Sequence, residues 1–97
     1  MATYLTLWKW TEQGVKYTKG TIDRVQAFKA DVQSRGGRIS EFMWTLGQWD
    51  GFFVADVEND ETLTAALLKL VGAGNVTTQT LRAFDEQEMG RILEKVG

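Results

Sequence analysis

The alternation of two hydrophobic patterns along the chain constrains its fold more than any other feature. Four short runs are rich in β-branched and aromatic residues, as strands are: residues 2–10, 39–46, 52–57 and 76–84. After Thr21 and again after Asn59, apolar residues recur at three- and four-residue intervals, as on one face of a helix. The resulting order, β-α-β-β-α-β, predicts a ferredoxin-like α+β fold whose antiparallel sheet carries both helices on one face.

Turn and capping signals set the ends of these elements. Asp50-Gly51 predicts a hairpin turn between the second and third strands. Glycines that follow Arg35 and Val71 end the two helices. Asp85, with Glu88 three residues later, forms a capping-box pattern and predicts a last helix whose apolar stripe is Met89, Ile92, Leu93 and Val96.

One face of the predicted sheet has no helix over it. We assign to this open face a largely aromatic set: Tyr4, Trp8, Trp10, Phe52, Val54 and Phe84. The helix side then receives the alternate residues: Leu5, Leu7, Phe53, Ala55, Val57, Leu81 and Ala83. A monomer rarely leaves so large an apolar patch in water, so we expect self-association through the open face into a homodimer or higher oligomer.

Composition excludes several classes of protein. The chain has 97 residues, which suits a single domain over residues 1–97. It has neither cysteine nor histidine, so we expect no disulfide, no metal site and no cofactor. A net charge of −2 without a basic run argues against nucleic acid or a membrane surface as partner. No apolar stretch reaches the length of a signal peptide or membrane span, and we expect a cytoplasmic protein.

Three stretches resemble the GYD domain family, which is named for a Gly-x-Tyr-Asp motif: WTEQGVK at 10–16, LGQWD at 46–50 and GNVTTQTLRAF at 74–84. They keep the order and spacing of that family. The resemblance implies a bacterial or archaeal protein with a ferredoxin-like fold of the dimeric α/β barrel type and no settled activity. Trp49 replaces the Tyr of the motif, so this chain lacks any function of a hydroxyl there, and Asp56 stands where the family tends to carry Glu.

The motif residues have a functional and a structural interpretation. The end of the first strand, the turn between the second and third, and the start of the fourth meet at one edge of the predicted sheet. A ligand pocket at this edge would use Gly47, Trp49 and Asp50, together with Tyr4 and Trp8 from the sheet. In the structural interpretation, which we favour, Gly47 supplies a positive φ, Asp50 accepts backbone N–H bonds and Trp49 packs the corner.

A second group of candidates depends on strand register. If Trp10 lies near both Phe52 and Val76, then Asp56 and Arg82 point to the same side of the sheet. Such a pair could polarise a small carbonyl or enol substrate, or it could fix the docking of two sheets.

Two hypotheses of function follow. The first is a homo-oligomeric protein that binds a small ligand or serves an assembly role. The alternative is a cofactor-independent oxygenase or isomerase of the dimeric barrel type, in which Asp56 or Asp50 is the base and Arg82 the oxyanion partner. The sequence does not decide whether the protein is an enzyme.

Overall fold

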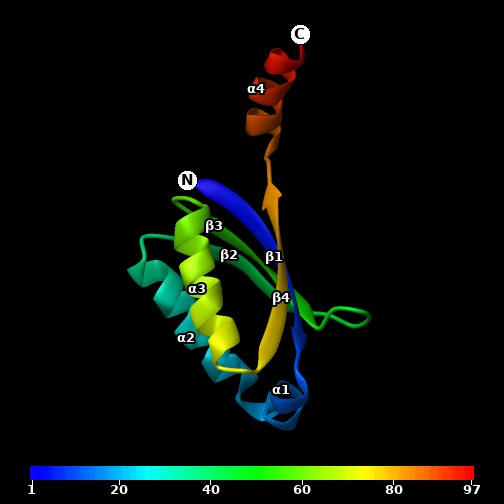
Figure 1. Cartoon of the computed structure of the whole chain (residues 1–97). Helices are drawn as coiled ribbons and strands as arrows, with labels where there is room; N and C mark the ends of the chain where they lie inside the picture. Colours follow the sequence, from blue (N-terminus) through cyan, green and yellow to red (C-terminus); the bar gives the residue numbers. More distant parts are fainter.

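The computed structural model describes residues 1–97 and has the predicted α+β architecture. Its four strands are β1 (Ala2–Trp10), β2 (Arg38–Trp44), β3 (Gly51–Val57) and β4 (Val76–Ala83). They form one sheet in the order β2-β3-β1-β4, and every neighbouring pair is antiparallel. This is the ferredoxin-like arrangement, with β3 and β1 in the centre (Figure 1).

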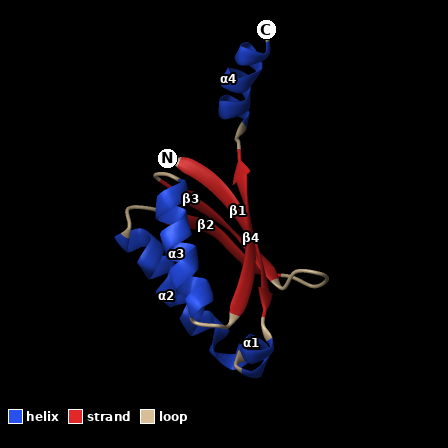
Figure 2. Ribbon diagram, in the orientation of Figure 1, coloured by secondary structure: helices blue, strands red, loops and turns tan.

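The helices are α1 (Glu12–Lys16), α2 (Thr21–Ser34), α3 (Asp60–Gly72) and α4 (Glu86–Val96), with a 3-10 turn at Thr18–Gly20. Only α2 and α3 cover the sheet, and both lie on the same face of it (Figure 2). No helix is both long enough and apolar enough to traverse a bilayer.

Capping side chains begin three of these helices. Thr11 and Asn59 each accept an N–H from the first turn of α1 and α3. Asp85 and Glu88 form the predicted capping box at the start of α4.

The register between β1 and β3 differs from the expected one, and the two faces of β1 are therefore exchanged. Leu7, not Trp10, lies opposite Phe52, a shift of three residues along β1. Because an odd shift moves every side chain of a strand to the other face, Tyr4 and Trp8 point toward the helices. The prediction that they lie on the open face is therefore wrong.

The other side of β1 turns with it. Trp10 lies opposite Val76 as expected, so the register between β1 and β4 is the predicted one. The side chains of β4 therefore lie on the opposite faces from those expected, as those of β1 do. The large apolar side chains on the open face, the one without helices, are therefore Leu5, Leu7, Met43, Phe52, Val54 and Leu81. Phe84 lies beyond the end of β4 and is 53% exposed.

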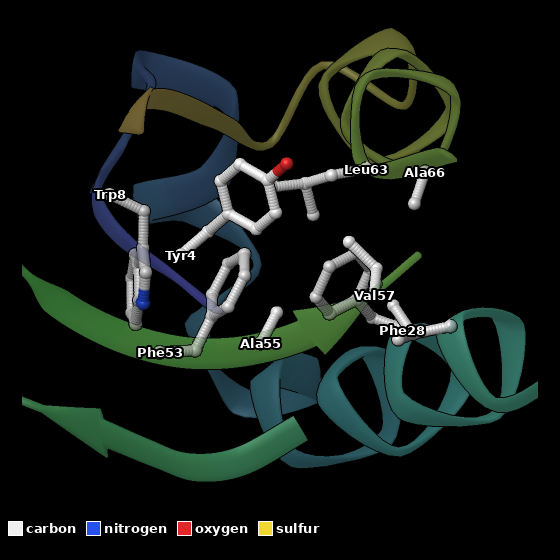
Figure 3. Packing of buried hydrophobic residues seen from close by; sticks show 9 residues of the cluster. Tyr4, Trp8, Phe28, Phe53, Ala55, Val57, Leu63 and Ala66 are labelled. Carbon is white, nitrogen blue, oxygen red and sulfur yellow. The ribbon is translucent and has the colours of Figure 1, made fainter. Parts of the chain in front are cut away.

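The core lies between the sheet and helices α2 and α3. The side chains of Tyr4, Trp8 and Phe53 rise from the strands toward Phe28 of α2 and Leu63 of α3 (Figure 3). The aromatic side of β1 removes more apolar area from water than its leucines would, which explains why it faces the helices. Ile22, the first apolar residue after Thr21, is 61% exposed and does not join the buried side of α2.

A β-bulge explains the uneven pattern of β2. Ile39 and Phe42 both pack against the core although they are three positions apart, an odd interval, because the register shifts between Ile39 and Glu41. The extra residue, Ser40, exchanges the two faces of the strand from that point on. Met43 consequently lies on the open face opposite Phe52.

Two further features matter for function. The predicted Asp50-Gly51 turn is wrong, because Gly51 already belongs to β3. The expected positive φ at Gly47 is confirmed (φ +108°). At the other end of the chain, α4 continues β4 away from the sheet rather than packing on it, and none of its residues is buried (Figure 1).

Candidate functional site

The three motif stretches meet at one edge of the sheet, as their topology predicts. The backbone N–H of Trp10 donates to Oδ2 of Asp50 at 2.9 Å, and the N–H of Asp50 donates to the carbonyl of Trp8 at 2.9 Å. Thr11 N–H donates to the carbonyl of Asn75 at 3.0 Å, which joins the end of β1 to the start of β4. The Asp50 carboxylate therefore satisfies the backbone at a strand end, which is the structural role considered for it.

The rest of the β2–β3 loop has few contacts. Gly47 is exposed at its positive φ, and the loop protrudes on the side of the sheet away from α2 and α3 (Figure 1). Trp49 is half-buried, and the Lys9 ammonium lies 5.0 Å from its ring centroid. Gly47, Trp49 and Asp50 thus lie together, but Tyr4 and Trp8, which were grouped with them as ligand-binding candidates, lie on the helix side of the sheet.

The structure separates Asp56 from Arg82. Asp56 pairs with Thr3 and lies on the face without helices, where it accepts hydrogen bonds from Thr3 Oγ1 at 2.6 Å and Arg38 Nε at 3.2 Å. Arg82 lies opposite Tyr4 and therefore on the other side. The expected shared side is wrong for the same reason that the faces of β1 are exchanged.

Arg82 instead joins β4 to α4. Its guanidinium lies 4.7 Å from the ring centroid of Phe84 and 5.6 Å from that of Tyr4, and it donates to Glu88 at 2.9 Å. This hydrogen bond lowers the pKa of the Glu88 carboxyl. Arg82 thus has a carboxylate partner on α4 and aromatic partners on its own side of the sheet.

Tyr4 is anchored at the top of α3. Its hydroxyl donates to the carboxylate of Asp60, the first residue of α3. Burial, and then the hydrogen bond to Asp60, raise the pKa of the Tyr4 phenol. A phenol held neutral by burial in this way ties β1 to α3 and is not prepared to act as a base at neutral pH.

A mostly apolar pocket lies elsewhere, between α2, α3 and the helix side of the sheet. It has a volume of about 260 Å³, and its apolar walls include Trp8, Trp10, Phe28, Phe42, Leu70 and Val76. The aromatic rings contact one another: the ring centroids of Trp8 and Trp10 are 5.4 Å apart in an edge-to-face arrangement, and those of Trp8 and Phe42 are 5.9 Å apart and tilted.

Charged residues of the two helices also line this pocket. Asp31 of α2 accepts from Arg35 at 3.0 Å and from Lys69 of α3 at 3.4 Å, so it links the two helices. The hydrogen bond from Arg35 is the main reason why the pKa of Asp31 is lowered. Arg24 lines the pocket as well but takes part in none of the ion pairs.

Of the predicted site residues, only Trp8 lines this pocket. Sequence reasoning missed the pocket because its other walls come mainly from α2 and α3, which carry none of the motif residues. The one available signal was Arg24, a basic residue directly beside the buried stripe that contains Val25 and Phe28.

The comparisons with known proteins agree with the family resemblance that the three motif stretches indicate. The sequence model of the GYD domain matches residues 4–93. Searches of curated proteins and of solved structures returned no match. Since the match spans all four strands and most of α4, the chain belongs to the GYD domain family.

Proposed function

We propose that the protein works as a self-assembling domain, in which two copies pack their open faces together as a homodimer or as the unit of a higher oligomer. One observation carries the proposal: the face of the sheet without helices has six large apolar side chains, of which Met43 is 49% and Leu81 45% exposed. A contiguous patch of this kind marks an interaction surface.

The projecting helix α4 supports a second copy of the chain as the occupant. Met89 and Leu93 lie on its apolar side and are exposed, and the protomer offers no surface that buries them. α4 leaves the sheet at the end of β4 and projects beyond it (Figure 2), so its apolar side is accessible to a second protomer. Two-fold pairing would satisfy both surfaces at once, and it is the arrangement that the resemblance to the family implies.

The alternative, a cofactor-independent oxygenase or isomerase, has less support. That mechanism needs a carboxylate base and a cationic oxyanion partner beside one substrate. Asp56 and Arg82 lie on opposite faces of the sheet, and Asp50 is bonded to the backbone of β1. We therefore propose no catalytic residue.

Native mass spectrometry with light scattering in solution tests self-assembly directly. We expect the unmodified protein to be a dimer or a multiple of dimers at micromolar concentration. The Leu81→Glu variant places a charge in the open face, and we expect it to shift the mass to the monomer because a carboxylate would have to be buried unpaired. Since Leu81 is already half-exposed in the protomer, the variant should still fold.

Leu68→Glu is the matched control. Leu68 lies on the outer side of α3 and is 69% exposed, so the same substitution there changes charge and hydrophobicity without touching the open face. We expect this variant to keep the oligomeric mass. A monomeric unmodified protein, or equal loss of mass in both variants, would contradict the proposal.

A further inference from the structure

The pocket between α2, α3 and the sheet contains donors that the protein itself does not satisfy. The Nη2 group of Arg24 and the Nε1 group of Trp8 are both buried and have no hydrogen-bond partner, and both residues line the pocket. Buried polar groups are nearly always paired, and a buried cation without an acceptor is especially costly. Two such groups in one pocket favour an occupant that carries a hydrogen-bond acceptor.

The charged residues around the pocket indicate the charge of its occupant. Arg24 and Lys69 contribute two positive charges and Asp31 one negative charge. The Asp31 carboxylate is already engaged by Arg35 and Lys69, which leaves Arg24 as the cation without a carboxylate. An anion would complete this set, and a guanidinium is suited to a planar carboxylate that accepts two parallel N–H bonds.

The walls of the pocket indicate the polarity and size of the rest of the occupant. Eleven of the sixteen lining residues are hydrophobic, with a cluster of aromatic rings on the sheet side. The volume of about 260 Å³ is slightly below the usual range of small-molecule sites, so the body must be compact. We infer that this pocket binds a small carboxylate with an apolar, ring-sized body, whose carboxylate is held by Arg24. This site lies on the opposite side of the sheet from the open face, and the inference does not depend on self-assembly.

Isothermal titration calorimetry of the full chain with 4-phenylbutyrate at pH 7 tests the inference, with 4-phenylbutanamide as the uncharged counterpart. We expect one phenylbutyrate to bind per chain. The amide should bind at least about tenfold more weakly, because it offers Arg24 no charge. No detectable binding of phenylbutyrate at millimolar concentration, or equal affinities for acid and amide, would overturn the inference.

A pair of arginine variants assigns the charged contact. Arg24→Gln should weaken phenylbutyrate binding about tenfold or more and leave the amide nearly unaffected. Arg38→Gln is the control, because Arg38 is an exposed arginine on the other face of the sheet. If both variants bind phenylbutyrate as the unmodified protein does, Arg24 is not the partner.

A pair of alanine variants tests the location without altering any charge. Ala27 and Ala30 are both exposed residues of α2, but only Ala27 lines the pocket. Ala27→Phe should fill the pocket and reduce binding at least tenfold, whereas Ala30→Phe should not. Both sites are exposed, so neither variant should prevent folding. Equal binding by the two variants would place the ligand elsewhere and contradict the inference.

Discussion

At the scale of single residues, Gly51 is the position where β3 has no room for a side chain. A Cβ atom built there would lie 2.2 Å from Cζ2 of Trp8 and 2.4 Å from the carbonyl oxygen of Met43. One contact is a buried ring and the other is backbone, so neither can move cheaply. We expect Gly51→Ala to lower the free energy of unfolding by about 1–3 kcal/mol, as overpacking of a core does.

Gly72 provides the comparison for Gly51. It is the last residue of α3, its φ is not positive, and no atom lies within 4 Å of a Cβ placed there. Gly72→Ala should stabilise the protein by up to about 1 kcal/mol, because alanine favours the helix. Urea denaturation of both variants measures the difference. Equal changes in the two would mean that the approach of Trp8 to Gly51 does not restrict this position.

A pH dependence follows from Asp31. The Arg35 guanidinium, assisted by Lys69, keeps the pKa of the Asp31 carboxyl below its usual value in the folded state. Between this lowered pKa and the usual value of about 4, the unfolded chain therefore binds more protons than the folded protein. The stabilisation is present above about pH 4 and is lost as the pH falls through the lowered pKa. We expect Asp31→Asn to cost about 1 kcal/mol at neutral pH and to make stability fall less steeply below pH 4.

The control for Asp31 is another aspartate of α2. Asp23 is exposed and belongs to none of the ion pairs, so Asp23→Asn should leave the acid dependence close to that of the unmodified protein. Denaturation with urea between pH 2.5 and 7 gives both curves. If the Asp31 variant retained the full acid dependence, its ion pairs would contribute nothing to stability.

At the scale of elements, the order and type of the strands and of α2, α3 and α4 could be predicted, because each has a strong local signal. Strand β1 and helix α2 begin where predicted, and the capping box of α4 depends only on Asp85 and Glu88. The faces of β1 could not be predicted in the same way. Leu5 and Leu7 on one side and Tyr4 and Trp8 on the other are both apolar, so alternation alone does not tell which side is buried.

The strand register determines which side chains of β1 face the helices, and the register is set by contacts between residues that are distant in sequence. The hairpin signal at Asp50-Gly51 suggested a tight turn, whereas the connection is a longer loop with its positive φ at Gly47. The bulge at Ser40 changes the pattern of β2 without any proline or glycine to indicate it. The motif corner at Asp50 was therefore predicted, but the separation of Asp56 from Arg82 and the pocket beside Arg24 were not.

At the scale of the whole molecule, the protomer has apolar surface on both sides of a single sheet, and only one side is covered by its own helices. If two open faces pair as proposed, folding and association are linked, because the folded protomer is stabilised by its partner. We expect the thermal midpoint of unfolding to rise with protein concentration between about 1 and 100 μM. Leu81→Glu should abolish this dependence, whereas Leu68→Glu should retain it, since only Leu81 lies on the open face. Calorimetric scans at several concentrations measure it, and a midpoint that does not change with concentration in the unmodified protein would show that the open face contributes nothing to stability through association.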